Sequence, residues 1–248
     1  MIFTISARMK PQGQSVLDFL GSNYPGIRLQ DIDSVFGFLE VSTLYGGRSF
    51  VLPELAPDDV VELYSAGIGV RIPFTNHYVE QEEYGDNQTF LEKYHREGNA
   101  VIVTNDKLAR WIRRDFPEYR IEASVIKDID TQEKITAALD LYDTVVLPMN
   151  MNEQHDFLAS IEHKNRITLF GSAGCALTCP SKICYPSFSK MNKFRGAQYR
   201  CSQTLKDRQQ MGMVDFDLDV LAGLGFDRFK LLRTRPEHLT KSGWSTGW

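Results

Sequence analysis

Short apolar stretches alternate along this chain with longer segments in which apolar residues recur at helical spacing. A strand followed by a helix, repeated many times, is typical of parallel β-α-β units. The pattern predicts strands at residues 1–6, 33–39, 69–74, 100–104, 120–126, 144–149, 166–171 and 226–232. It predicts helices at residues 15–24, 57–66, 89–97, 106–116, 131–142, 152–163 and 215–225.

This number of repeated units favours a (β/α) barrel of the TIM type over an open, doubly wound sheet. A glycine-rich phosphate-binding sequence, which would favour the open sheet, does not follow the first predicted strand. No repeat, low-complexity stretch or linker divides the sequence. We therefore predict an α/β fold, an irregular or incomplete (β/α) barrel that forms a single domain over residues 1–248.

Catalytic groups of such barrels lie where the strands end at their carboxyl edge. Asn76 and Asn105 directly follow two predicted strands and are candidates for substrate positioning. Glu122 lies within a strand, where it either points into the barrel as a proton-exchanging group or faces a helix or the solvent. Arg71 is a candidate for gripping an anionic substrate, with a surface salt bridge as the simpler alternative. His77 is the histidine nearest to this predicted face.

The bulk composition is that of an ordinary globular protein, with 42% hydrophobic and 24% charged residues. The formal net charge of −4 gives no overall electrostatic attraction for nucleic acid. There is neither an apparent signal peptide nor an apolar run long enough to cross a bilayer, so we expect no membrane partner. A cytoplasmic location follows as the expectation, and in that reducing compartment disulfides are disfavoured.

All four cysteines fall in one segment, residues 171–201, with the spacing C-x3-C-x4-C-x16-C. Cys175, Cys179, Cys184 and Cys201 match the four sulfur ligands of a tetrahedral zinc or a [4Fe–4S] cluster. Structural zinc sites usually contain pairs with C-x2-C-like spacing, whereas this spacing is wider and favours the cluster. Zinc remains an alternative, as do buried thiols that bind no metal.

Two stretches of the sequence, one that contains Cys175 and Cys179 and a later one that contains Lys230, resemble the collagenase-like peptidases of family U32. The sequence GSAGCALTCP matches a cysteine–proline motif of that family through Gly174, Cys175, Cys179 and Pro180, although Ser172 stands where Asn is common. The sequence GFDRFKLLRTR resembles the family's later motif. Lys230 and Arg233 stand at the positions of that motif's Lys and Arg, but Leu232 stands in place of its Gly.

The resemblance implies a barrel that holds a [4Fe–4S] cluster on the four cysteines near its catalytic mouth. It further implies a redox enzyme, such as an oxygen-independent hydroxylase or a modifying enzyme, acting on a small aromatic or nucleobase substrate. An RNA substrate and an electron donor or partner protein are also compatible with the family. Two alternatives stay open: a non-enzymatic binding protein stapled by its metal, and a peptidase, as the family name suggests.

Overall fold

The computed structural model describes residues 1–179, 181–204, 206–207 and 213–232. Pro180 and Arg233, which carry part of the family resemblance, lie outside the described residues. Eight parallel strands close into a barrel in the order β1-β10-β7-β6-β5-β4-β3-β2. They are β1 (Ile2–Ser6), β2 (Ile32–Phe36), β3 (Gly69–Phe74), β4 (Ala100–Val103), β5 (Arg120–Ala123), β6 (Thr144–Val146), β7 (Ile167–Phe170) and β10 (Arg228–Leu231).

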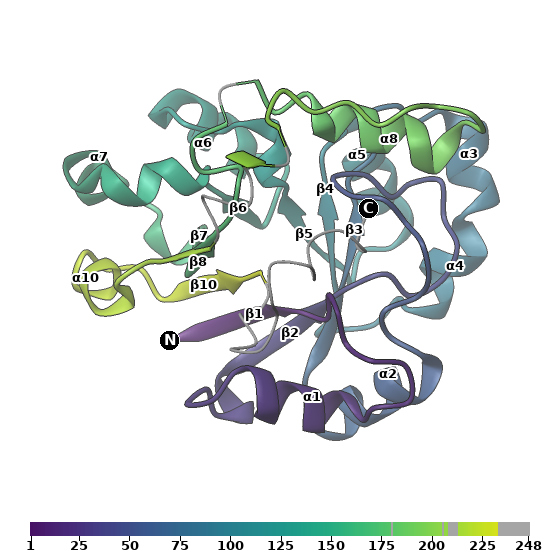
Figure 1. Cartoon of the computed structure of the whole chain (residues 1–248), viewed down its shortest axis with the longest axis horizontal. Coiled ribbons are helices and arrows are strands. Elements are labelled where there is room, and N and C mark those ends of the chain that lie inside the picture. Colours follow the sequence, from purple (N-terminus) through teal and green to yellow (C-terminus); the bar gives the residue numbers. More distant parts are fainter. Residues whose placement is uncertain (180, 205, 208–212, 233–248) are drawn as a thin grey trace.

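Helices connect successive strands and surround the barrel (Figure 1). They are α1 (Val16–Asn23), α2 (Pro57–Ser65), α3 (Gln81–Asp86), α4 (Gln88–Lys93), α5 (Asp106–Asp115), α6 (Gln132–Leu139), α7 (His155–Ser160) and α10 (Leu218–Gly223). Short 3-10 helices lie at Leu29–Asp31, Val125–Lys127, Met149–Glu153 and Lys164–Arg166. The predicted (β/α) barrel is confirmed, and its ring of strands is closed rather than incomplete.

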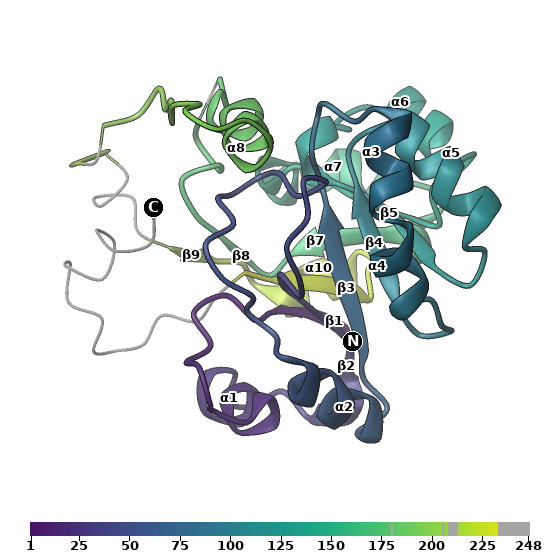
Figure 2. The same ribbon diagram turned by 90° about the vertical axis from the view of Figure 1, so that its right-hand side faces the viewer.

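An excursion between β7 and β10 makes the barrel irregular. It contains α8 (Cys184–Lys193) and an antiparallel pair of very short strands, β8 (Ser172–Ala173) and β9 (Val214–Asp215). In both views of the molecule, α8 lies on the side opposite to α1 and α2 (Figures 1 and 2). The segment that carries all four cysteines is therefore added onto one end of the barrel.

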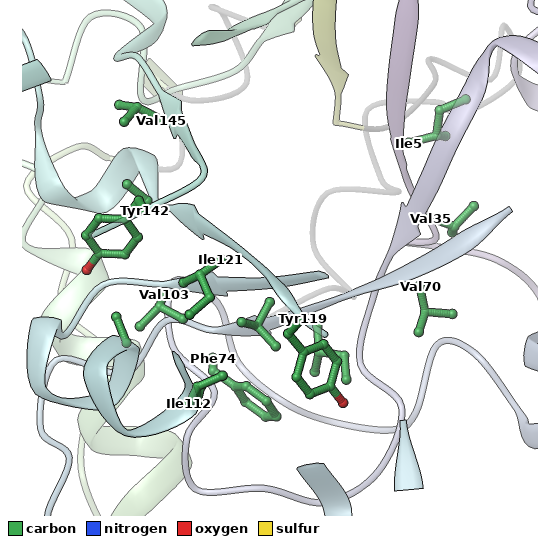
Figure 3. Packing of buried hydrophobic residues seen from close by; sticks show 14 of the residues in the cluster. Ile5, Val35, Val70, Phe74, Val103, Ile112, Tyr119, Ile121, Tyr142 and Val145 are labelled. Atoms are coloured by element: carbon green, nitrogen blue, oxygen red, sulfur yellow. The ribbon is translucent and has the colours of Figure 1, made fainter. Parts of the chain in front are cut away.

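The hydrophobic core lies between the strands and the surrounding helices. Strand residues such as Val70, Val103 and Ile121 are fully buried and form one cluster with Ile112 of α5 (Figure 3). Because successive strand residues point to opposite faces, the residues beside them in sequence face the inside of the barrel. The apolar cluster thus consists of the side chains on the outer faces of the strands and of the helix residues that pack against them.

The inside of the barrel is unusually polar for this architecture, in which bulky aliphatic residues normally fill the interior. Arg71 of β3, Glu122 of β5 and Lys230 of β10 are all at least 95% buried, and their side chains meet one another inside the ring. Of the two orientations considered for Glu122, the inward one is the one that the structure shows.

Two predicted elements differ from those observed. The helix expected over residues 152–163 is divided into a 3-10 turn (Met149–Glu153) and α7, because the Asn152 side chain bonds to the Phe170 carbonyl of β7. The polar segment after β3, in which no helix is predicted from the sequence, forms α3, whose first turn is closed by a capping box between Glu80 and Glu83. Within the ranges described, no helix has the length and hydrophobicity that crossing a bilayer requires.

Candidate active site and cysteine cluster

A cavity of about 240 Å³ opens among the carboxyl ends of the strands. Its wall is mainly apolar and aromatic, with contributions from β-strand ends, the loop after β2 and helix α8. The apolar and aromatic residues of this wall include Phe36, Pro73, Ile102, Val125, Ile126, Met149, Phe170, Tyr185 and Phe188. A site of this form and position is where ligands bind in (β/α) barrels.

The cysteine segment supplies one side of this cavity. Cys175 lies just after β8 and Cys184 is the first residue of α8, and both line the cavity. Burial and, to a smaller extent, the nearby thiols of Cys175, Cys201 and Cys179 together raise the pKa of the Cys184 thiol to about 12. All four cysteines are therefore close enough to interact electrostatically across this end of the barrel.

Cys179 and Cys201 lie on neighbouring parts of the same segment. The Sγ atom of Cys179 is 3.4 Å from the hydroxyl of Ser202, which directly follows Cys201. Backbone N–H groups donate to both sulfurs at 3.4 Å, from Lys182 to Cys179 and from Gln203 to Cys201. Burial would raise the pKa of Cys179, but these hydrogen bonds outweigh it and the pKa is lowered. Such N–H donors are the groups that stabilise metal-bound thiolates.

The fit of these residues to a metal group can be tested on their arrangement. The four cysteines, all within the described ranges, are thiols without a disulfide. In the described part of the chain, no three His, Cys, Asp or Glu side chains converge on a point that a single metal ion would occupy. The fit to a metal group therefore rests on the number and chemistry of the thiols and on the N–H donors at Cys179 and Cys201. Their chemistry and number suit a group with several metal atoms.

The floor of the cavity is formed by Lys230, whose Nζ lies 4.7 Å from the centre of the Phe36 ring. Its ammonium group donates to the Oε1 atom of Glu122 at 2.7 Å. The other carboxylate oxygen of Glu122 accepts a short hydrogen bond from Arg71. One carboxylate therefore holds two buried cations.

The network continues toward the opposite end of the barrel. Arg71 also donates to Asp33 at 2.8 Å, and Asp33 pairs in turn with the half-exposed Arg120 at 2.8 Å. Burial alone would raise the pKa of Glu122, but Arg71 and Lys230 together hold it below its ordinary value. Burial lowers the pKa of Lys230, and the Glu122 carboxylate opposes that shift. The five side chains form a continuous chain of charge through the barrel.

The two predicted asparagines lie at the carboxyl edge but outside the wall of the cavity. The Asn76 amide is fully buried and donates to the carbonyl oxygens of Thr43, Tyr45 and Ser189, at 2.8, 3.1 and 3.0 Å. It thereby ties the loop after β2 to helix α8. These contacts place Asn76 in the support of the cavity, and its predicted role in binding substrate stays a prediction.

Asn105 caps the N-terminus of α5. Its Oδ1 atom accepts from the backbone N–H groups of Lys107 and Leu108, and its amide donates to the carbonyl of His77. Asn and Asp are preferred at this position because they satisfy N–H groups that have no partner within the helix. Like Asn76, Asn105 has a structural explanation, while its contact with a substrate stays a prediction.

The loop after β2 closes the cavity on another side. Arg48 forms a two-pronged ion pair with Glu54 and stacks over the Phe38 ring, with the guanidinium carbon 3.9 Å from the ring centre. Gly46 packs directly against the Thr75 backbone, and a Cβ atom there would lie 2.3 Å from the Thr75 carbonyl oxygen. Only glycine permits this approach, which brings the loop to the cavity.

Sequence reasoning missed the position of Lys230 at the floor of the cavity and the aromatic contribution of α8. The signal for Lys230 was present, because a lysine in the middle of the apolar strand FKLL requires a buried partner. The sequence contains no such signal for Tyr185 and Phe188, because no helix is predicted in the cysteine segment that carries them.

No family model matches this chain, and no curated protein matches it. A search of solved structures finds similarity to a structure described as that of the U32 peptidase Mk0906. The TM-score is 0.63 at 13% sequence identity, and the match covers 95% of this chain and 93% of the other. At this identity the similarity shows the fold, and it agrees with the barrel implied by the family resemblance.

Proposed function

We propose that this protein is an iron–sulfur redox enzyme that modifies a small molecule bound at the mouth of the barrel. In this proposal Cys175, Cys179, Cys184 and Cys201 hold a [4Fe–4S] cluster. The observation that carries it is that two of these cysteines, Cys175 and Cys184, form part of the wall of the cavity. A metal group on them would lie beside any ligand in that cavity.

The sequence spacing of the cysteines favours a cluster over a single zinc ion, because structural zinc sites usually contain C-x2-C-like pairs and this chain has none. In a [4Fe–4S] cluster each of the four cysteines would bind a different iron. The backbone N–H donors at Cys179 and Cys201 suit either metal group.

An enzyme accounts for the barrel mouth better than a purely structural metal does. If a metal only stabilised the cysteine segment, that segment could fill the mouth of the barrel. A cavity of about 240 Å³ remains there instead. A peptidase is less well supported, although His77 Nδ1 lies 2.9 Å from the hydroxyl of Ser189. Ser189 is completely buried, so that its hydroxyl is out of reach of a peptide bond.

Each part of the site has a role in this proposal. When bound, the cluster would supply one-electron transfer next to the cavity. The rings of Phe36, Phe170 and Phe188 exclude water and hold a planar substrate. Arg71 and Glu122 act as positioning residues, because they contact Lys230 or its partner rather than the cavity. Asn76 fixes α8, and with it Cys184, against the loop after β2.

The substrate class that fits this cavity is a small aromatic molecule or a free nucleobase, and an RNA would have to present a single base. A redox reaction also requires an electron donor, which we propose to be a partner protein or a small carrier. Four thiols that form no disulfide are stable in a reducing compartment, so the cytoplasm is the location that we propose.

Anaerobic purification followed by metal analysis and a visible spectrum tests the proposal. We expect a brown protein with about four irons per chain. The Cys184→Ser variant should lose most of that iron, whereas Lys190→Ala, an exposed change on the same helix, should retain it. A colourless protein with about one zinc per chain would contradict the cluster and favour a structural metal site.

A further inference from the structure

The charges around the cavity are strongly one-sided. Among the described residues that line it, three are cationic (Arg8, Arg48 and Lys230) and none is acidic. This contrasts with the whole chain, in which 32 acidic residues exceed 28 basic ones. A wall with cations and no carboxylate attracts anions and repels cationic ligands.

The network under the cavity has the same imbalance. Its three cations, Arg71, Arg120 and Lys230, outnumber its two carboxylates, Asp33 and Glu122, although Arg120 is half-exposed toward the opposite end of the barrel. Glu122 is shared between Arg71 and Lys230, so Lys230 has no carboxylate to itself. An anion in the cavity would therefore meet an ammonium group whose charge is compensated only in part.

Lys230 is the member of the network that a ligand can reach. It lines the cavity, whereas Arg71 and Glu122 do not. One of the three N–H bonds of its ammonium group is directed at Glu122, and the group has the capacity for further acceptors. Arg48 is already committed to both oxygens of Glu54, so it offers less to a ligand than Lys230 does.

We propose that the cavity binds a small organic anion, with its carboxylate or phosphate group on the Lys230 ammonium and an apolar, planar body against the aromatic wall. This inference rests on the proposed function and deepens it by naming the substrate class. The hydroxyls of Ser6 and Ser124, which also line the cavity, lie at the ends of β1 and β5 and provide further donors to the anion. The Glu122–Arg71 pair fixes Lys230 at the floor.

Four ligands that share one phenyl ring and differ in their polar group test this proposal on the wild-type protein: benzoate, phenyl phosphate, benzyl alcohol and benzylammonium. Their affinities are measured by NMR titration on protein prepared anaerobically. Either benzoate or phenyl phosphate should bind roughly tenfold or more tightly than benzyl alcohol, and benzylammonium most weakly. The better of the two anions identifies the headgroup. Equal binding of the alcohol or the ammonium compound, or binding of none of the four, would overturn the proposal.

A pair of variants assigns the preference to Lys230. Because Lys230→Met alone would leave Glu122 with one partner fewer, it is combined with Glu122→Gln, which keeps Arg71 paired with Asp33. The double variant should lose the preference for anions, and Lys107→Met, a change of an exposed lysine on α5, should keep it. A preference retained by the double variant would refute the role of Lys230.

Iron content, measured on the same samples, separates this inference from the proposed function. Iron without a preference for anions would refute only the substrate class. A preference for anions in a protein that binds no iron would refute only the redox function.

Discussion

Replacing Glu122 by glutamine removes the one carboxylate that holds two buried cations. Glu122 is 1% exposed, and its oxygens accept from Arg71 and from Lys230. Glutamine keeps the size and shape of the side chain and some of its hydrogen bonds, but not its charge. Arg71 retains Asp33 as a partner, whereas Lys230 loses the carboxylate to which the structure pairs it.

The cost should be large because an uncompensated charge stays inside the barrel. Breaking a buried ion pair by removing one partner typically costs about 3–5 kcal/mol. For a chain of this length, 1 kcal/mol shifts the melting temperature by about 2–4 °C, so the expected loss is roughly 6–20 °C. Glu118→Gln, the same change at an exposed site, should stay within about 0.5 kcal/mol of the wild type.

The pH dependence gives the carboxylate a signature of its own. The folded-state pKa of Glu122 lies below its ordinary value of 4.5, so its ionised form stabilises the protein above that pH. As the pH falls from 4.5 toward the folded-state pKa, Glu122 takes up a proton in the unfolded state while it stays ionised in the folded state, so this stabilisation is lost. The difference in unfolding free energy between the wild type and Glu122→Gln should therefore be constant near neutral pH and shrink below 4.5.

Urea unfolding of both variants at several pH values measures these differences. A loss below about 1 kcal/mol for Glu122→Gln would mean that the pair behaves like a surface salt bridge and that the interior is hydrated. A difference that does not change with pH would show that the charge of Glu122 contributes nothing and that only its packing matters. Either result would refute the account of a charged barrel interior.

Two further predictions concern the asparagines at the carboxyl edge. Asn105→Ala removes the N-cap of α5 and should cost about 1 kcal/mol in urea unfolding, while the affinity for benzoate stays unchanged. Asn76→Ala removes the amide that donates to two carbonyl groups of the loop after β2 and to one of α8, and it should cost about 2–3 kcal/mol. Amide hydrogen exchange should become faster in α8 before it does in other elements of the Asn76→Ala variant. Faster exchange in the other elements but not in α8 would contradict the role of Asn76 in supporting that helix.

The alternation of strands and helices could be predicted from the sequence because each strand has an apolar face toward the helices. Strand β3 was predicted with the bounds that the structure has, residues 69–74. The interior was harder to predict, since it depends on which charged residues meet across the ring. Glu122 and Lys230 are 108 positions apart, and only closure of the barrel brings them to 2.7 Å.

The candidate site was predicted unevenly for a related reason. The four cysteines could be identified by their unusual clustering alone, which requires no tertiary information. Residues after the strands were identified by position, but Asn76 and Asn105 are bonded to backbone groups whose location the sequence does not reveal. Helix α8 was not expected, although it supplies Cys184, Tyr185 and Phe188 to the cavity.

The charged interior and the cysteine segment meet at the cavity from two sides. Lys230 belongs to β10, the strand that follows the cysteine segment, and the register of β10 against β1 and β7 fixes its height in the barrel. Cys184 belongs to α8, which Asn76 and Asn192 tie to the loop after β2 by hydrogen bonds to Tyr45 and Ser189. The cation and the cysteines are thus held by separate parts of the fold. Substitutions of the cysteines and of Lys230 therefore act on different elements of the fold, which is the physical reason why the two proposals can be tested independently.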